Sequence, residues 1–184
     1  MVENEFKVML NEQQYDTISA MFAWNKRVEQ TNYYFDTPDF YLFTNHITCR
    51  VRVVDGKFLL QMKLLNGESY SRIEVEQELG DTLPDALTGA QLSALCGREG
   101  LPDVALLGSL STVRLVKDFG GAEIDLDKSS YFGKTDCELE IEFTDEAAAR
   151  AILATIKNKA GITTGNVVCK GKVYRFLDEY KKTI

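Results

Sequence analysis

Hydrophobic and polar residues alternate along several stretches of this chain, a pattern typical of strands with one buried face. The alternation is strictest from Ile47 to Val54 and resumes from Phe58 to Leu64. Asp55 and Gly56 separate these two stretches, and an Asp-Gly pair between alternating segments is a strong hairpin signal. The same pattern predicts further strands over Glu3–Leu10, Thr31–Phe35, Ser71–Leu79, Ser111–Asp118, Ala122–Asp127 and Asp136–Phe143.

Two other segments have the apolar spacing and the end signals of helices. One runs from about Glu12 to Ala23, after Asn11 and with Gln14 in the position of a capping-box partner. The other runs from Asp145 to Lys159. It is rich in alanine, acidic at its start and basic at its end, and Gly161 follows it as a stop signal.

The remaining segments predict two shorter helices. Thr88 and Gln91 resemble a capping box that opens a short helix, in a stretch interrupted by Pro84 and Pro102. The tail Lys170–Lys182 is expected to form a short strand or turn that runs into a last helix. About eight strands with a few peripheral helices predict an α+β fold, either an antiparallel barrel or a strongly curved sheet. We expect one domain over residues 1–184, with a helical insert at about 81–110.

The overall charge narrows the choice of function. The chain has 28 acidic and 21 basic residues, a formal net charge of −7. Nonspecific nucleic-acid binding generally needs a basic surface, so we do not expect it. No apolar run approaches the ~20 residues that span a bilayer, and the N-terminus lacks the pattern of a secretory signal. The sequence therefore predicts a cytoplasmic protein with no membrane partner.

Cysteine and histidine give no basis for covalent catalysis. The four cysteines, Cys49, Cys96, Cys137 and Cys169, are far apart, and we expect reduced and mostly buried thiols. His46 is the only histidine and lies in a polar stretch, so a Ser–His–Asp or Cys–His hydrolase would depend on it. No nucleophile-elbow motif is present. Covalent hydrolysis is therefore not expected.

Charged residues two positions apart share one face on several of the expected strands. These sets are Glu3, Glu5 and Lys7; Arg50 and Arg52; Lys63 beside Gln61; Arg72, Glu74, Glu76 and Glu78; Arg114; Asp125 and Asp127; and Glu138, Glu140 and Glu142. One interpretation is a solvated outer face. The other is a polar lumen, because repeated carboxylates repel one another unless a cation compensates them.

A polar lumen of this kind has a definite chemistry. Clustered carboxylates bind hard cations such as Mg²⁺ or Mn²⁺, and clustered Arg and Lys bind phosphates. Both kinds of residue together, without a histidine base, indicate phosphoryl transfer by positioning and charge neutralisation.

With these charged strands the sequence resembles the CYTH superfamily, the triphosphate tunnel metalloenzymes. The resemblance rests first on the N-terminal ExExK pattern of Glu3, Glu5 and Lys7. The other matching segments are Asn32–Asp39 (NYYFDTPD), Arg50-Val-Arg52, Asp55-Gly-Lys57 with Lys63, Arg72-Ile-Glu74-Val-Glu76, Arg114 with Lys117, Asp125, Glu140-Ile-Glu142 and Lys170-Gly-Lys172. The segments cover nearly the whole chain, and with the insert they look most like the branch found in Gram-positive bacteria.

The resemblance implies an eight-stranded antiparallel tunnel in which Mg²⁺ or Mn²⁺ assists the hydrolysis of a triphosphate. It implies metal ligands at Glu3, Glu5, Glu74 and Glu142. Residues that orient the water or hold a second metal would be Glu76, Asp125 and Glu140. Residues that bind phosphate would be Lys7, Arg50, Arg52, Lys63, Arg72, Arg114, Lys117, Lys170 and Lys172, of which Lys170 and Lys172 could exchange roles.

Several alternatives remain open at the level of the sequence. The substrate could be inorganic tripolyphosphate, thiamine triphosphate or a nucleoside triphosphate. The chain could instead be a class IV-type adenylate cyclase, which needs an adenine pocket, or a non-catalytic module that binds polyphosphate or a nucleotide. A pure anion binder would not need the acidic set, which favours the enzyme. A monomer and a homodimer are both compatible with the sequence.

Overall fold

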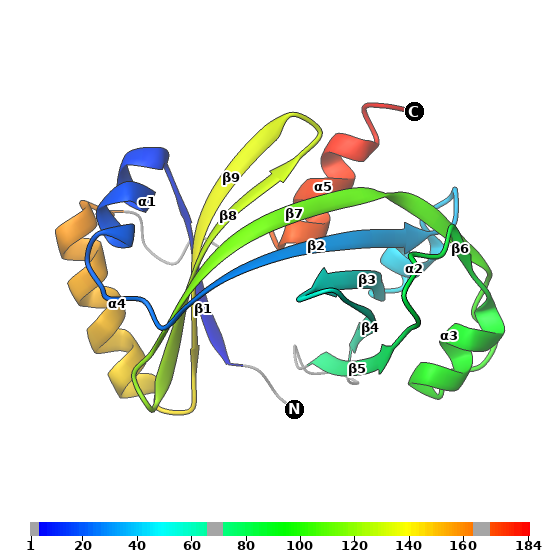
Figure 1. Cartoon of the computed structure of the whole chain (residues 1–184), viewed down its shortest axis with the longest axis horizontal. Helices are drawn as coiled ribbons and strands as arrows, with labels where there is room; N and C mark the ends of the chain where they lie inside the picture. Colours follow the sequence, from blue (N-terminus) through cyan, green and yellow to red (C-terminus); the bar gives the residue numbers. More distant parts are fainter. Residues whose placement is uncertain (1–3, 66–71, 164–169) are drawn as a thin grey trace. The chain divides into compact units, whose positions relative to one another are not determined.

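The structure is a computed structural model that describes residues 4–65, 72–163 and 170–184 (Figure 1). In these ranges it has nine strands and five helices. The strands are β1 (Glu5–Leu10), β2 (Lys26–Asp36), β3 (Thr48–Val54), β4 (Lys57–Leu65), β5 (Arg72–Glu78), β6 (Ala86–Leu87), β7 (Val104–Asp118), β8 (Ala122–Tyr131) and β9 (Lys134–Phe143). The helices are α1 (Glu12–Ser19), α2 (Tyr41–Thr44), α3 (Gly89–Cys96), α4 (Glu146–Ala160) and α5 (Lys172–Tyr180).

The chain forms two compact units, each described here by itself. The first, which we call the arginine unit, comprises residues 30–110 and 172–184. The second, which we call the acidic unit, comprises, among the described residues, 4–29 together with 111–163, 170 and 171. All strand pairs within each unit are antiparallel. The predicted α+β class with antiparallel pairing is confirmed.

In the sheet of the arginine unit, β2 to β5 pair in the order in which they follow along the chain. Residues 30–36 of β2 pair with β3, β3 pairs with β4, and β4 pairs with β5. The predicted hairpin at Asp55 and Gly56 is confirmed, with φ angles of 50° and 76°. Positive φ at both central residues is what a two-residue hairpin turn of this type requires. The two-residue turn determines the register of β3 with β4, whereas residues 37–47, which include α2, join β2 to β3.

One face of this sheet is apolar and packs against the insert. Its buried side chains include Val51, Leu60 and Met62 from the sheet and Leu92 from α3. The capping box of Thr88 and Gln91 forms as the sequence predicts, with both reciprocal bonds present. The other face of the same sheet carries the charged side chains described below.

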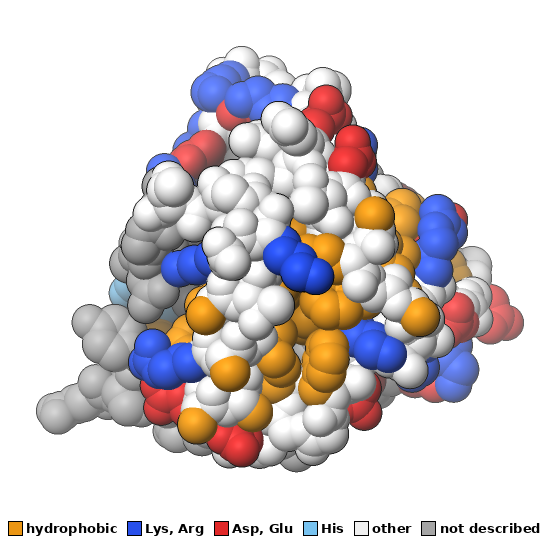
Figure 2. Space-filling model, turned by 90° about the vertical axis from the view of Figure 1, so that its left-hand side faces the viewer, with side chains coloured by type: hydrophobic (Ala, Val, Ile, Leu, Met, Phe, Trp, Pro, Cys, Tyr) orange, Lys and Arg blue, Asp and Glu red, His pale blue; other side chains and the backbone are white. Residues whose placement is uncertain are grey.

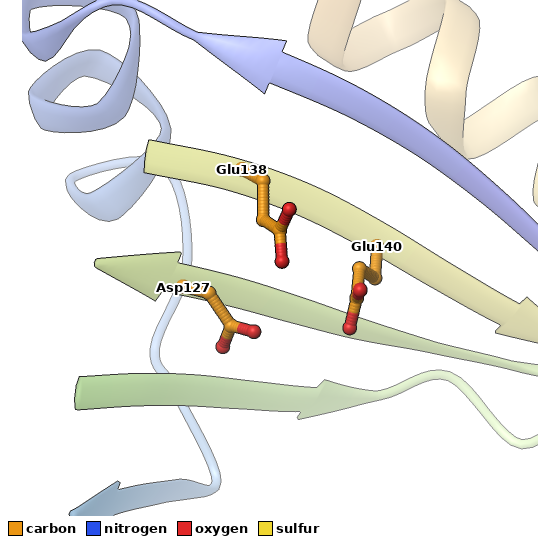
Figure 3. A group of neighbouring side chains, drawn as sticks. All are labelled: Asp127, Glu138 and Glu140. Atoms are coloured by element: carbon orange, nitrogen blue, oxygen red, sulfur yellow. The ribbon is translucent and has the colours of Figure 1, made fainter. Parts of the chain in front are cut away.

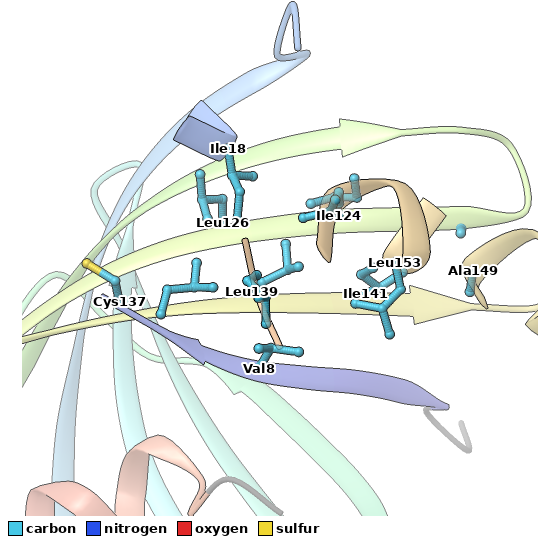
Figure 4. Close-up of a cluster of buried hydrophobic side chains, with 13 residues drawn as sticks. Val8, Ile18, Ile124, Leu126, Cys137, Leu139, Ile141, Ala149 and Leu153 are labelled. Carbon is cyan, nitrogen blue, oxygen red and sulfur yellow. The ribbon is translucent and has the colours of Figure 1, made fainter. Parts of the chain in front are cut away.

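The strands of the acidic unit also have one apolar face and one charged face. β1, β9, β8 and residues 111–118 of β7 pair in that order. The apolar face of these strands packs against α1 and α4, and a cluster that includes Val8, Ile18, Leu139 and Leu153 is buried there (Figure 4). Figure 2 views the side on which α1 and α4 lie and shows hydrophobic side chains between Lys and Arg side chains. This cluster determines which face of each strand is left for the charged residues.

The structure corrects several predicted boundaries. Helix α1 ends at Ser19 instead of Ala23, because the Trp24 indole donates a hydrogen bond to the Ser19 carbonyl at 2.7 Å. β2 and β7 both begin earlier than predicted, at Lys26 and Val104. β8 continues to Tyr131, and the short elements β6 and α2 were not expected. The helical part of the predicted tail is confirmed as α5.

Three further expectations concern the barrel, the number of domains and the membrane. The eight-stranded barrel stays a prediction, since strand pairing is described within each unit. The single domain over 1–184 with its insert likewise stays a prediction. None of the described helices combines the length and apolarity needed to cross a membrane.

Candidate functional site

The polar face of the acidic unit brings together charges from four strands. In the register of these strands, Lys7 lies opposite Glu140, and Glu140 lies opposite Asp125. A neighbouring row joins Glu138, Asp127 and Arg114. The next row on the other side contains Glu5, Glu142 and Glu123. We call this set of residues the acidic face, and it exists because side chains two positions apart on a strand point the same way.

Most carboxylates of the acidic face are buried. Asp125, Asp127, Glu138 and Glu140 are exposed by 2%, 0%, 1% and 6%. Oxygens of the last three lie within 4.8 Å of one another, and Figure 3 shows these side chains pointing into one region from β8 and β9. Isolated buried carboxylates are costly, so such a cluster needs cations. The alternative of a solvated face is therefore wrong for these four carboxylates of β8 and β9, whereas Glu123 at the end of the same face is exposed.

Arg114 supplies one of these cations. Its Nε donates to Asp127 Oδ1 at 2.8 Å, and its Nη2 donates to Asp127 Oδ2 and to Glu140 Oε2, both at 2.7 Å. Its Nη1 also donates to Asp125 Oδ2. Burial would lower the pKa of Arg114, but Asp127, Asp125 and Glu140 outweigh it and raise that pKa. The guanidinium is thus a built-in counter-ion for three carboxylates.

Asp125 is a carboxylate that this arrangement compensates only in part. Burial raises its pKa to about 7; Arg114 opposes the rise, whereas Asp127, Glu140 and Glu123 add to it. Among the described residues, no hydrogen-bond partner lies within reach of Asp125 Oδ1. Asp125 therefore presents a buried oxygen on the face where the sequence predicts metal and water chemistry.

Lys7 is the second cation of the acidic face. Its Nζ lies 2.7 Å from Glu140 Oε1 and 3.2 Å from Glu5 Oε1. Burial would lower the pKa of Lys7, but Glu140 and Glu5 outweigh burial and raise it. Lys7 thus remains a positive charge between the predicted metal ligand Glu5 and the predicted catalytic residue Glu140.

The polar face of the arginine unit carries Arg50, Arg52 and Lys63 from adjacent strands, together with Asn32, Gln61 and Glu74; we call these six residues the arginine face. Arg50 Nε donates to Gln61 Oε1 at 2.7 Å, and Arg52 Nε donates to Asn32 Oδ1 at 3.0 Å. In both pairs the two residues are direct partners in the register of neighbouring strands. The two amides are buried, whereas the arginines are half-buried.

Carboxylates of β5 contact the same cations. Glu74 Oε2 lies 2.9 Å from Lys63 Nζ, and Glu74 Oε1 lies 3.5 Å from Arg50 Nη2. Glu76 accepts a hydrogen bond from Gln61 Nε2 but is itself exposed. β5 therefore balances part of the positive charge of the arginine face.

Helix α5 adds residues that the sequence interpretation missed. Its Phe176 ring packs against Tyr34 at a tilt of 45° with a centroid distance of 4.7 Å, which places the helix beside the arginine face. Burial raises the pKa of Tyr34, and the nearby Arg50, Arg52 and Arg175 oppose the rise. Arg175 follows Lys172 by three positions, a helical spacing that puts both on one side of α5. That spacing was the available signal for Arg175.

Other predicted site residues lie elsewhere or are not described. Lys117 pairs in register with Ile124 on the opposite face from Arg114, and its Nζ lies 5.9 Å from the Phe119 ring centroid. Lys170 is exposed before α5, whereas Lys172 is half-buried. Glu3 lies outside the described residues, and Arg72 begins β5. Asn32 and Gln61 were not predicted as site residues, because the candidates were chosen by charge and an amide carries none.

Comparison with known proteins identifies the family. The model of the CYTH domain matches residues 1–170. The chain belongs to the CYTH family. A Bacillus subtilis (strain 168) protein named "Putative triphosphatase YjbK" is 31% identical over 192 residues, covering 100% of this chain and 98% of the relative. The predicted CYTH resemblance is confirmed along the whole length of the chain.

Solved structures agree on the fold of this CYTH chain. A Bacillus halodurans structure described as a "putative adenylate cyclase" has a TM-score of 0.72 at 24% identity, over 95% of this chain and 97% of the other. HpAC1 from Hippeastrum, described as a "putative adenylyl cyclase" with a dominant triphosphatase activity, has a TM-score of 0.72 at 21% identity, over 96% of both chains. At these identities the likeness concerns the CYTH fold alone.

Proposed function

We propose that this CYTH protein hydrolyses a small triphosphate with the help of a divalent cation. Inorganic tripolyphosphate, thiamine triphosphate and nucleoside triphosphates are the candidate substrates. The relative named as a triphosphatase supports this proposal, because its 31% identity extends over the full length of both chains. The chemistry requires a site for the cation, cations for the phosphates and a group that orients water.

The acidic face is the observation that carries this proposal. It combines a row of three carboxylates, Glu5, Glu142 and Glu123, with the buried row that contains Lys7, Glu140 and Asp125. A protein that only bound an anion would gain nothing from so many buried acids, since they repel phosphate. Acids beside cations suit a substrate that arrives with a metal ion.

The donor set fits a hard divalent cation. All candidate ligands are carboxylate oxygens, which Mg²⁺ and Mn²⁺ prefer. Glu5, Glu142 and Glu123 stand in register, and like charges so placed are destabilising unless a cation lies among them. The cluster of Asp127, Glu138 and Glu140 fits less well, because Arg114 already binds two of its members. Glu5 and Glu142 are thus the proposed ligands, with Glu3 and Glu74 as the further ligands that the resemblance implies.

The protein's own residues would bind and orient the substrate. When bound, the cation supplies Lewis-acid polarisation of phosphate oxygens. Arg50, Arg52 and Lys63 would bind phosphate oxygens by charge-assisted hydrogen bonds, with Lys7, Arg72, Arg114 and Lys172 as further candidates. Asp125 and Glu140 would orient the water for in-line attack at the terminal phosphate, a role that the resemblance also gives to Glu76. No thiol or imidazole enters this scheme.

The matched variants Glu142→Gln and Glu12→Gln test the proposal. Glu142 is a proposed ligand, whereas Glu12 is exposed on α1. Phosphate release from tripolyphosphate with Mg²⁺ should fall by at least about a hundredfold in the first variant, as for loss of one electrostatic stabiliser, and stay unchanged in the second. Full activity of Glu142→Gln, with an unchanged melting temperature, would contradict the metal assignment.

A further inference from the structure

The two arginines of the arginine face have the same kind of hydrogen-bond partner at Nε. Each donates its Nε to a side-chain amide directly opposite on a neighbouring strand: Arg52 to Asn32 Oδ1 at 3.0 Å and Arg50 to Gln61 Oε1 at 2.7 Å. Arg114, in contrast, donates its Nε to the carboxylate of Asp127. At Nε, therefore, the chain holds Arg50 and Arg52 by neutral amides and Arg114 by an acid, and among the described residues Arg50 meets an acid only at Nη2, which lies 3.5 Å from Glu74 Oε1.

The amide contacts determine where the guanidinium groups point. A guanidinium is planar and rigid, so a fixed Nε defines the plane and the direction of both terminal nitrogens. Asn32 is 0% exposed and Gln61 is 5% exposed, so both amides are held by the surrounding strands. Gln61 is anchored at its other end as well, because its Nε2 donates to Glu76. Arg50 and Arg52 are thus oriented before any ligand arrives, which reduces the ordering cost of binding.

A neutral partner at Nε also adds no negative charge beside the positively charged guanidinium. An aspartate in place of Asn32 would accept the same hydrogen bond but would add a buried negative charge beside Arg52. That charge would repel an incoming phosphate and compete with it for the guanidinium. An amide is the partner that orients an arginine without adding such a charge.

We propose that Asn32 and Gln61 are positioning residues that orient Arg52 and Arg50 for phosphate while adding no negative charge at the site. This inference rests on the proposed triphosphate substrate. Asn32 has a further feature consistent with an anion nearby: its buried Nδ2 donor has no hydrogen-bond partner among the described residues. The two amides act through the arginines and need not touch the substrate.

The test compares binding of inorganic tripolyphosphate, measured by isothermal titration calorimetry in EDTA so that divalent metal is absent. Asn32→Asp keeps the size of the side chain, and we expect at least about tenfold weaker binding, equivalent to about 1.4 kcal/mol. Gln77→Glu is the matched control, because it makes the same amide-to-acid change at an exposed residue of β5 in register with the apolar Leu60. It should bind within about twofold of wild type, since isolated surface charges contribute little.

A double-mutant cycle separates positioning from a general loss of structure. In an Arg52→Gln background, Asn32→Asp should add less than about a twofold loss, because coupled residues are not additive. The inference would be overturned if the affinity losses of the two single variants multiplied in the double variant, or if Asn32→Asp bound tripolyphosphate like wild type. If Asn32→Asp fails to fold, the cycle of Gln61→Met with Arg50→Gln decides by the same criterion. If the wild-type protein does not bind in EDTA, the cycle is repeated with Ca²⁺; absence of tripolyphosphate binding under both conditions would instead contradict tripolyphosphate as the substrate of the proposed function.

Discussion

Arg114 and Asp127 form a two-point ion pair across β7 and β8, with Nε to Oδ1 at 2.8 Å and Nη2 to Oδ2 at 2.7 Å. Asp127 is fully buried, and the same guanidinium also binds Glu140 and Asp125. One cation thus compensates three acids from two strands. The acidic face depends on this arginine before any ligand binds.

Replacing Arg114 by Met should strongly destabilise the protein. The change leaves three buried carboxylates without their shared counter-ion, and breaking a buried pair in this way costs on the order of 3–5 kcal/mol. The free energy of unfolding, measured by urea titration in EDTA, checks this. Arg27→Met removes an ion pair with Glu29 in which both side chains are largely exposed, and it should cost less than about 1 kcal/mol. Equal effects of the two variants would contradict the role of Arg114.

Asp125 should make stability fall as pH rises. Its pKa is raised from 3.8 to about 7, so the folded state binds more protons than the unfolded state between these values. The contribution of Asp125 to stability is therefore fully present below its unfolded pKa and is lost as pH rises through about 7. Asp125→Asn removes this titration, so it should stabilise the protein more, relative to wild type, at pH 8 than at pH 5. The comparison uses urea unfolding in EDTA.

The control for this pH experiment is Asp16→Asn, which makes the same change at an exposed position of α1. Its effect on the free energy of unfolding should be small and nearly the same at both pH values. If Asp125→Asn behaved in the same way, the raised pKa of Asp125 would be contradicted.

The carboxylate of Asp36 should be needed for the segment that carries α2. It is buried and accepts backbone hydrogen bonds from Thr37 at 2.7 Å, Leu42 at 2.9 Å and Phe43 at 3.0 Å. Asp36→Asn turns one acceptor into a donor that faces backbone N–H groups. Because bonds to charged groups contribute about 1.5–3 kcal/mol each, we expect a loss of at least about 2 kcal/mol in urea unfolding. A loss below about 0.5 kcal/mol, as for an ordinary surface change, would contradict this role.

Much of the fold could be predicted because the strands have a regular period. Alternation showed which residues share a face, and the Asp55-Gly56 turn set the register of β3 with β4, so the pairing of Arg50 with Gln61 follows from the sequence. Element ends were less predictable because tertiary contacts determine them. β2, for example, begins just after Asn25, whose backbone N–H donates to the Val116 carbonyl 2.8 Å away.

The burial of the site was harder to predict than the residues that form it. Alternation groups Asp125, Asp127, Glu138 and Glu140, but it does not say whether that face is covered or open to water. The burial of these acids follows from packing between strands distant in sequence. The role of Asn32 depends on its register with Arg52, twenty positions away, which no local pattern encodes.

Metal and triphosphate together should stabilise the protein more than the sum of each alone. Self-repulsion on the acidic face opposes folding, and ligands that bind only the native state relieve it. At a ligand concentration of about 100 times Kd the gain is about 2.7 kcal/mol, which should raise the melting temperature by roughly 5–10 °C. Thermal melts with tripolyphosphate, with Ca²⁺ and with both check this. An unchanged midpoint at millimolar ligand would contradict a site for these groups.

The most direct measurement is a phosphate-release screen of the full chain against tripolyphosphate, thiamine triphosphate and the common nucleoside triphosphates. Each substrate is tested with Mg²⁺, Mn²⁺, Ca²⁺ and EDTA, and ATP reactions are also analysed for cyclic AMP. We expect rapid release of phosphate from at least one triphosphate with Mg²⁺ or Mn²⁺ and none in EDTA. Turnover that persists in EDTA, cyclic AMP as the main product, or binding without any turnover would contradict a metal-assisted triphosphatase.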